Sequence, residues 1–259
     1  MVEGSLRARR DRGEPSLVPY VMAGVAPDWP DQVRACVDAG ADAVEIGLPF
    51  SDPMLDGPVI QAASTRALAR GVTVSGLLDE VAGISVDVPL VAMTYSNVVH
   101  RRGDAAFCRG LAETGIAGLI APDTPLDEID ELRAAADAAP LELALLVAPI
   151  TAPERAARVA ERSRGFVYVV SNMGVTGGRS TVSGTVARTT ATVRAATTLP
   201  VLVGFGISTP EQAAEVARHA DGVIVASALV ADVLDGADAA GVGRRVTRFR
   251  RGVDGGRGR

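Results

Sequence analysis

The sequence contains no lysine, only two histidines and two cysteines. Without lysine, a Schiff-base mechanism has no amine nucleophile. His219 lies at a predicted helix end and His100 beside two arginines, so neither indicates a Ser/His/Asp arrangement or a metal site. Cys36 and Cys108 have neither metal-ligand spacing nor a disulfide pattern. This cysteine usage favours a reducing compartment, and we expect a cytoplasmic protein.

Several partner classes are also excluded by what is missing. Aromatic residues make up only 3% of the chain, too few for the stacking platforms of many nucleic-acid-binding proteins. The net charge of −5 creates no overall positive field that would attract nucleic acid or an anionic membrane. No apolar run approaches the roughly 20 residues that span a bilayer, and the start of the chain lacks a signal-peptide core. Glycine-rich nucleotide-binding motifs are absent as well.

The most informative segment that is present is Ala41–Pro58, with the sequence ADAVEIGLPFSDPMLDGP. It begins as an apolar strand that carries Glu45 between two apolar neighbours, where a carboxylate is costly unless it has a partner or a function. The Gly/Pro-rich loop that follows contributes Asp52 and Asp56. A strand that leads into an acidic loop is a common source of acid–base residues. For Asp52, which precedes a proline, ordinary turn chemistry is an equally good explanation.

Eight short apolar runs alternate with amphipathic helical patterns along the chain. The predicted strands are Leu17–Met22, Ala43–Gly47, Leu90–Thr94, Gly118–Ala121, Leu141–Val147, Phe166–Val170, Pro200–Gly204 and Gly222–Ala226. The predicted helices are Trp29–Asp38, Val59–Arg70, Asp104–Thr114, Leu126–Ala138, Pro153–Arg162, Gly184–Ala196, Pro210–Arg218 and one from Ala228 onward. This alternation predicts an α/β protein with a parallel sheet and right-handed crossovers. Eight units without a flexible linker predict one (β/α)₈ TIM-barrel domain over residues 1–250, with a disordered Gly/Arg tail at 251–259. A doubly wound open sheet is the alternative.

A weak internal repeat supports the barrel. Its three copies are Ala39–Gly47, Thr114–Asp123 and His219–Ser227. Each copy reads as a helix end, a small-residue turn and an apolar strand, with Gly40 and Gly115 as predicted helix C-caps. The repeat places Glu45, Asp123 and Ser227 at the carboxyl ends of strands. In a barrel of this kind, that end is the catalytic face.

Three small-residue loops follow the last three predicted strands. They are Ser171–Ser180, Gly204–Ser208 and Ala226–Ala228. Loops after strands seven and eight of a barrel often bind phosphate through backbone N–H groups and a helix N-terminus. We therefore expect a phosphate site built of neutral dipoles, with Arg179 as the one cationic candidate. The first loop reads either as a lid over the substrate or as a merely flexible connection. Together, carboxylates and a phosphate site indicate proton transfer on a phosphorylated small molecule.

Six segments carry a resemblance to a known family. They are DAGADAVEIGLPFSDPMLDGPVIQ (38–61), MTYSN (93–97), GLIAPDTP (118–125), LLVAPIT (145–151), FVYVVSNMGVTGG (166–178) and PVLVGFGISTPEQAAEVARHADGVIVASALV (200–230). From about Pro15 to Leu234 the chain resembles the α subunit of tryptophan synthase. The resemblance implies a (β/α)₈ barrel that needs no cofactor. It also implies retro-aldol cleavage of indole-3-glycerol phosphate to indole and glyceraldehyde 3-phosphate, in tryptophan biosynthesis. The implied partner is a pyridoxal-phosphate-dependent β subunit, which consumes the indole in an α2β2 heterotetramer.

The resemblance also implies roles for individual residues. Glu45 matches the family's acid/base, and Asp56 matches the carboxylate that holds the indole N–H. The other residues implied in substrate binding are Tyr20, Tyr95, Ile120, Tyr168, Thr176, Gly177, Gly206, Ala226 and Ser227. The residues implied in contact with the β subunit are Asp52, Pro53 and Asn97.

The chain departs from the family pattern in places. Ala226 stands where the family usually has glycine, which places a methyl group near the expected phosphate. Asn172 and Met173 replace the arginine and alanine common in the lid, and Val98 and Thr124 are also atypical. Two further functions therefore remain open. One is a free-standing lyase that releases indole for a secondary pathway, and the other is a non-catalytic subunit that activates a β partner.

Overall fold

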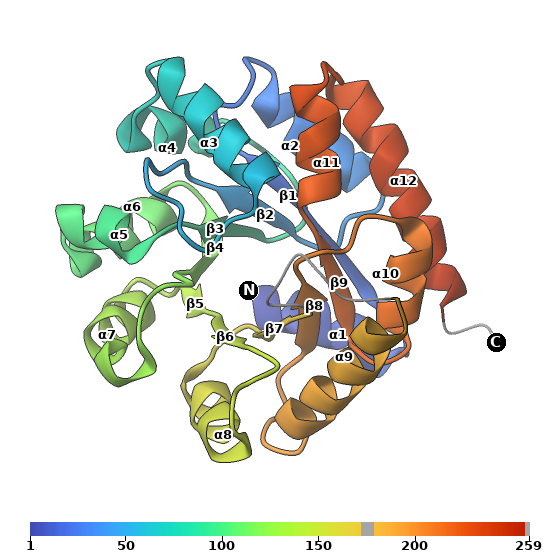
Figure 1. The fold of residues 1–259 in the computed structure, drawn as a ribbon. Helices are drawn as coiled ribbons and strands as arrows, with labels where there is room; N and C mark the ends of the chain where they lie inside the picture. The colour runs from blue at the N-terminus through green and yellow to red at the C-terminus, as the bar shows by residue number, and fades with distance from the viewer. Residues whose placement is uncertain (172–178, 257–259) are drawn as a thin grey trace.

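The computed structural model describes residues 1–171 and 179–256 of the 259-residue chain, with side chains from residue 184 onward in the second part. In these ranges the chain forms a parallel sheet surrounded by helices (Figure 1). Its strands are β1 (Ser16–Met22), β2 (Val44–Gly47), β3 (Leu90–Met93), β4 (Ile116–Ile120), β5 (Glu142–Leu143), β6 (Leu145–Val147), β7 (Val167–Val170), β8 (Val201–Gly204) and β9 (Gly222–Val225). Each strand lies within two residues of the expected range, because short apolar runs between turn residues mark buried parallel strands clearly.

The sheet closes into a barrel at β5 and β6. The strand order is β5-β4-β3-β2-β1-β9-β8-β7-β6, so the two ends of the sheet are β5 and β6, which are separated in sequence only by Ala144. The Ala144 N–H donates to the Leu119 carbonyl at 3.0 Å. The two short strands therefore act as one strand position, the predicted segment Leu141–Val147. The (β/α)₈ barrel is confirmed and the open-sheet alternative is wrong.

Helices form the outer layer of the barrel in Figure 1. They are α1 (Val2–Asp11), α2 (Trp29–Asp38), α3 (Pro58–Ala69), α4 (Val74–Ala82), α5 (Ser96–Arg102), α6 (Asp104–Glu113), α7 (Asp130–Ala138), α8 (Pro153–Arg162), α9 (Arg179–Arg194), α10 (Pro210–Ala217), α11 (Ser227–Leu234) and α12 (Ala239–Gly255), with a 3₁₀ turn η1 (Leu126–Glu128). No helix in the described part of the chain combines the length and apolar character that a membrane crossing requires. Helix α12 runs five residues past the tail boundary expected at residue 250, because Val253 is fully buried and anchors its last turn.

Three helices, α1, α4 and α5, were not predicted from the sequence, and the one helix expected from Ala228 onward is two helices, α11 and α12. The most consequential is α1, whose only buried residues are Val2 and Leu6. Both belong to the core inside the barrel, so α1 closes the end of the barrel opposite the strand carboxyl ends. The Glu142 carboxylate accepts the N–H groups of Val2 and Glu3, donors that a helix start leaves without an intrahelical partner. Two apolar residues in a charged segment were too weak a pattern to predict this helix.

The core has two parts, and they are separated by the alternation of side chains along each strand. One cluster fills the space between the strands and the helices and includes Val44 and Ile46 of β2. The other lies inside the barrel. Because successive residues of a strand face opposite sides, Glu45 points inward while its two neighbours pack against helices. A buried aliphatic side chain contributes about 2 kcal/mol, so the outer cluster strongly determines the register that turns Glu45 inward.

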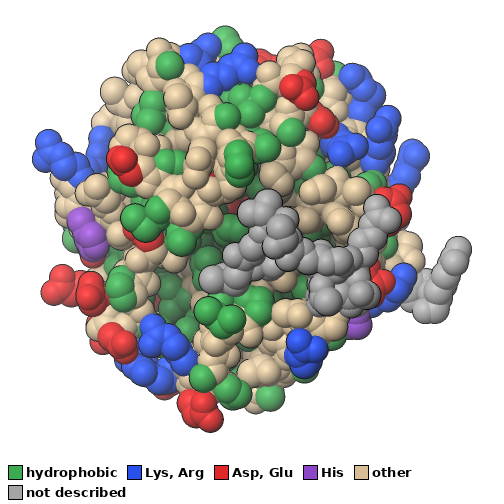
Figure 2. Space-filling model, in the orientation of Figure 1, with side chains coloured by type: hydrophobic (Ala, Val, Ile, Leu, Met, Phe, Trp, Pro, Cys, Tyr) green, Lys and Arg blue, Asp and Glu red, His purple; other side chains and the backbone are tan. Residues whose placement is uncertain are grey.

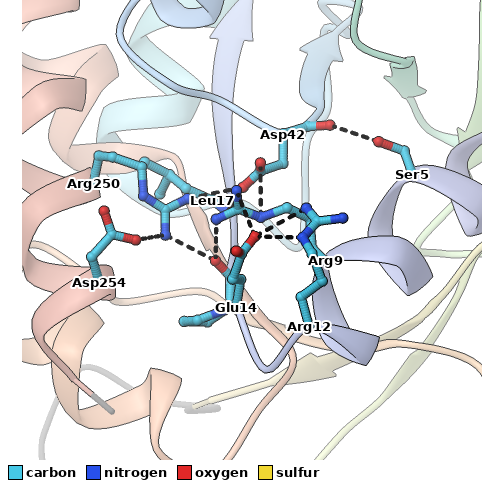
Figure 3. A network of polar contacts seen from close by, with 9 residues as sticks. Ser5, Arg9, Arg12, Glu14, Leu17, Asp42, Arg250 and Asp254 are labelled. Atoms are coloured by element: carbon cyan, nitrogen blue, oxygen red, sulfur yellow. Dashed lines mark hydrogen bonds and ion pairs between the residues drawn. The ribbon is translucent and has the colours of Figure 1, made fainter. Parts of the chain in front are cut away.

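A polar network joins the first and last helices to the sheet (Figure 3). At its centre, the Asp42 carboxylate accepts the Leu17 N–H at 2.8 Å and pairs with Arg9 at 3.2 Å and Arg250 at 2.9 Å. Arg250, on α12, also pairs with Asp254 at 2.6 Å. The network links α1, β1, the residues just before β2, and α12. It therefore fixes the part of the barrel wall formed by β1 and β2, the strands that contain Tyr20 and Glu45.

Candidate active site

A cavity of about 380 Å³ opens at the carboxyl ends of the strands. Residues from seven segments line it: Tyr20, Glu45, Asp56, Gly57, Pro58, Val59, Ile60, Met93, Tyr168, Phe205, Gly206, Ile207, Ile224, Ala226 and Ser227. Figure 2 shows the corresponding face in space-filling form, hollowed near its centre and bordered there by hydrophobic side chains. Its volume is within the range typical of small-molecule sites, and its lining is mainly apolar with a few converging polar groups.

Glu45 and Asp56 line this cavity together, as expected. Glu45 comes from β2 and is 1% exposed, whereas Asp56 comes from the β2–α3 loop and is partly buried. Among the described residues, Glu45 Oε2 has no hydrogen-bond partner. A buried carboxyl oxygen without a partner is costly, and here it faces a cavity in which a substrate can satisfy it.

The two carboxyl groups differ in acidity. The pKa of Glu45 is raised from 4.5 to about 8. Burial is the larger cause of this rise, and the negative charge of Asp56 is the smaller one. Burial also raises the pKa of Asp56, to about 6, but a hydrogen bond from the Tyr95 hydroxyl opposes this rise. At neutral pH the first group therefore carries a proton and the second is mostly ionised. Such a pair, one acid and one anion, is suited to general acid catalysis beside a charge-stabilising group.

Two tyrosines, Tyr20 and Tyr168, form walls of the cavity. Each depends on a glycine in the neighbouring strand: a Cβ on Gly47 would overlap the Tyr20 hydroxyl, and a Cβ on Gly204 would overlap that of Tyr168. Burial raises the pKa of both tyrosines most. The next largest cause is the charge of Glu45 for Tyr168 and the charge of Asp56, then that of Glu45, for Tyr20. Both hydroxyls therefore lie near the acidic pair.

The other end of the cavity has the features expected of a phosphate site. Gly206, in a left-handed conformation at φ 77°, follows Phe205, which has φ 65°. The Phe205 carbonyl accepts a hydrogen bond from the Ser171 hydroxyl, which holds this loop. Ser227 is the first residue of α11 and lines the cavity, so the start of that helix, whose first N–H groups have no intrahelical partner, borders it. Ala226 lines the cavity beside it.

Some expected residues lie elsewhere. Tyr95 does not line the main cavity but borders a small adjoining space together with Asp56. Ile120, also expected in the pocket, is the last residue of β4, but its side chain is fully buried in the core inside the barrel and does not line the cavity. Thr176 and Gly177 lie outside the described residues, as do the atypical positions Asn172 and Met173.

Several other lining residues were not predicted from the sequence. They are apolar or backbone-contributing: Gly57, Pro58, Val59, Ile60, Met93, Phe205, Ile207 and Ile224. Phe205 and Ile207 were inside a loop already marked for phosphate, so their position was a usable signal. Gly57 and Pro58 lie in the acidic loop already singled out, while Val59, Ile60, Met93 and Ile224 read as ordinary helix or strand residues that only the closed barrel turns toward the cavity.

The residues expected at a partner surface surround the mouth of the barrel. Asp52 and Asn97 are exposed and Pro53 is partly exposed. Beside them, Met54 is 78% exposed and Leu55 47% exposed. Large apolar side chains exposed side by side mark an interaction surface more often than an isolated one does.

A second hollow, of about 680 Å³, opens at the opposite end of the barrel among α1, α8 and α9. Its lining combines the polar residues Glu3, Glu161 and Arg164 with Thr197, which is partly buried, and Thr198, which is exposed. Although it is larger, it lacks buried acid–base groups, so the chemistry places the active site in the smaller cavity. The described residues contain no cluster of His, Cys, Asp and Glu that could hold a metal ion.

Comparison with known proteins identifies the family. The family model described as tryptophan synthase alpha chain matches residues 6–251. The tryptophan synthase alpha chain of Gloeobacter violaceus is 50% identical over 235 residues, 88% of this chain and 84% of that protein. That of Synechocystis is 44% identical over 247 residues, 93% of each.

Solved structures agree with the sequence comparison. The tryptophan synthase structure of Mycobacterium tuberculosis superposes with a TM-score of 0.89 at 39% identity, and covers 98% of both chains. The tryptophan synthase α subunit of Legionella pneumophila gives 0.89 at 31% identity, also over 98% of both. Sequence and fold agree over nearly the whole length, and the chain belongs to the tryptophan synthase alpha chain family.

Proposed function

We propose that this chain cleaves indole-3-glycerol phosphate to indole and glyceraldehyde 3-phosphate, as the α subunit of tryptophan synthase in tryptophan biosynthesis. The observation that carries the proposal is the placement of Glu45 and Asp56 in one cavity whose far end contains Gly206 and Ser227. The cavity thus provides acid–base groups for the indole and neutral dipoles for the phosphate. We propose that the reaction needs no cofactor of this chain, because each of its steps is a proton transfer or a charge stabilisation.

The chemistry requires a proton at indole C3 before the carbon–carbon bond can break. Glu45 is protonated at neutral pH, with a pKa of about 8, and it donates this proton to C3. The resulting carboxylate then removes the proton from the glycerol hydroxyl next to the ring. The electron pair of the C–C bond returns to the ring, and indole and the aldehyde are released. One proton is given and one is taken, so Glu45 ends the cycle protonated.

Asp56 has the complementary task. Protonation at C3 places positive charge on the ring nitrogen, and an ionised carboxylate nearby stabilises that charge. The Asp56 pKa of about 6 keeps it ionised at neutral pH. Tyr20 and Tyr168 flank the ring on either side of this pair. The phosphate lies at the opposite end, against the Gly206 backbone and the start of α11.

The test is indole release from indole-3-glycerol phosphate by the full chain, followed by absorbance. We expect turnover by the wild type that inorganic phosphate inhibits competitively, because phosphate occupies the site at Gly206 and Ser227. Absence of indole release, with the β subunit present or absent, would refute the proposed function.

We also propose a tryptophan synthase β subunit as the partner, in an α2β2 heterotetramer. The proposed contact surface is the exposed group at the barrel mouth, comprising Asp52, Pro53, Met54, Leu55 and Asn97. A charge at Met54 removes apolar contact area, so Met54→Glu should weaken β binding about tenfold or more in titration calorimetry. As a matched control, Leu68→Glu alters an apolar side chain that is 36% exposed in the last turn of α3, at the opposite end of the barrel, and should bind normally. Equal affinity of the two variants would contradict this surface.

A further inference from the structure

Asp123, which follows β4 and lies outside the cavity, is bonded twice to one residue of another element. Its carboxylate accepts the Ser96 N–H at 2.8 Å and the Ser96 hydroxyl at 2.7 Å. Ser96 is the first residue of α5, and Tyr95 immediately precedes it. The two bonds therefore fix the backbone from which the Tyr95 side chain departs, and they link the end of β4 to the β3–α5 junction.

Tyr95 in turn is held on several sides. Its ring stacks against Phe50 with the ring centroids 5.3 Å apart. Its hydroxyl oxygen accepts the Leu55 N–H at 3.0 Å, and Tyr95 borders the same small space as Asp56, where its hydrogen bond lowers the Asp56 pKa. Leu55 and Asp56 are consecutive residues of the β2–α3 loop. One tyrosine hydroxyl thus fixes both the backbone and the side chain of the loop that carries the second catalytic carboxylate.

The titratable groups that face Asp56 come from four elements. They are Glu45 from β2, Tyr20 from β1, Tyr168 from β7 and Tyr95 from the β3–α5 junction. Burial raises the pKa of Asp56, and among these groups the Tyr95 hydroxyl lowers it. The ionised state of Asp56 at neutral pH therefore depends on where the Tyr95 hydroxyl is placed.

We propose that Asp123 is a positioning residue for the catalytic pair: through Ser96 it fixes Tyr95, and Tyr95 holds Asp56 at the indole nitrogen. The inference rests on the proposed function, because Asp56 must carry charge only if an indole ring is to be protonated. It assigns a role to a carboxylate that does not touch the cavity. It also explains why the β4 end carries an acid although the catalytic acids come from β2 and its loop.

The experiment compares the pH dependence of kcat/KM for indole release by full-length wild type, Tyr95→Phe, Asp123→Ala and the double variant. The acid limb of the kcat/KM profile is the fall in activity below about pH 6, where Asp56 becomes protonated. In Tyr95→Phe this limb should move to higher pH by about one unit, because the group that lowers the Asp56 pKa is gone. Asp123→Ala should move it in the same direction by less. The double variant should behave like Tyr95→Phe alone, since Asp123 acts through Tyr95.

The direction of the shift separates this role from simple electrostatics. Removing a negative charge near Asp56 would by itself lower the Asp56 pKa and move the acid limb to lower pH. The matched control is Asp127→Ala, which removes an exposed carboxylate four residues away that pairs with Arg155 and Arg158. It should leave the profile unchanged. Ser96→Ala removes only the hydroxyl contact and tests the same path with less risk to folding.

Several results would overturn the inference. The first is an acid limb that does not shift in either Asp123→Ala or Ser96→Ala. The second is a shift of this limb to lower pH. The third is a shift in the double variant equal to the sum of the shifts in the two single variants. Each is measured against a wild type that releases indole. A wild type without activity would instead refute the proposed function, so the two failures are distinguishable.

Discussion

Replacing Glu45 with glutamine removes the proton donor while nearly conserving volume. In the wild type this carboxyl group is 1% exposed and its Oε2 has no partner among the described residues. Glutamine cannot donate a proton to indole C3 or accept one from the glycerol hydroxyl. Because both steps use this one side chain, we expect kcat to fall by about 10⁴-fold, the upper end of the range for acid–base groups.

The same substitution should change how stability depends on pH. The pKa of Glu45 rises from 4.5 in an ordinary setting to about 8 in the folded protein, so the folded state binds this proton more tightly. Its contribution to stability is therefore fully present below the unfolded pKa and is lost as the pH rises through about 8. Linkage gives a loss of about 3 kcal/mol between about pH 5 and pH 8 in the wild type. Glutamine does not titrate, so this part of the slope should disappear.

Urea unfolding at several pH values, together with the indole assay, measures both effects. A matched control is Glu142→Gln, another buried carboxylate inside the barrel, which accepts the Val2 and Glu3 N–H groups at the far end. It should lose stability yet keep turnover. More than about a tenth of wild-type turnover in Glu45→Gln would remove this residue from the chemistry. An unchanged pH slope of stability would refute the argument that burial raises its pKa.

Three further predictions concern the second carboxylate, the cavity wall and the terminal network. Asp56→Asn should lower kcat by about 10²-fold to 10³-fold in the same indole assay, and it should abolish the acid limb of the pH profile near pH 6. An unchanged pH profile would assign that limb to another group. Gly47→Ala should destabilise the fold by about 1–3 kcal/mol and displace Tyr20, because the added methyl overlaps its hydroxyl; denaturant unfolding measures this, and wild-type stability would contradict the close approach. Arg250→Ala should cost about 2 kcal/mol by leaving the Asp42 carboxylate with fewer partners, and high salt should not reproduce the loss, because both side chains are largely buried.

Strand positions could be predicted from the sequence because parallel strands in a barrel are buried on both faces. They therefore appear as apolar runs such as Val201–Gly204 between turn residues. The two glycines expected to cap helix ends, Gly40 and Gly115, each follow the C-cap residue (Ala39 and Thr114) and have the left-handed φ values of 94° and 88° that close a helix there. Helices with a narrow apolar face were missed. In α1 the buried face is only Val2 and Leu6, and nothing in the pattern shows that they close a barrel.

Within the site, the acids and the small-residue loops could be predicted, but the walls could not. Glu45 was evident because a carboxylate in an apolar strand demands an explanation. Ile120 was expected in the pocket, but although it ends β4, its side chain is buried in the barrel core. Tyr95 was expected at the indole, yet its hydroxyl is instead committed to Leu55 and Asp56. Side-chain direction at a strand end depends on register and loop path, which the residue types alone do not specify.

By itself, the amino-acid sequence determined the order of strands and helices, the family, and the residues able to transfer protons. These follow from local patterns: apolar periodicity, turn residues, and charged groups placed where charge is costly. Only the tertiary structure decided that Glu45 is protonated and Asp56 ionised at neutral pH. A pKa depends on the surrounding medium and on neighbouring groups: burial raises the pKa of both acids, the charge of Asp56 raises that of Glu45, and Tyr95 from the β3–α5 junction lowers that of Asp56. Closure of the barrel is what brings those segments together.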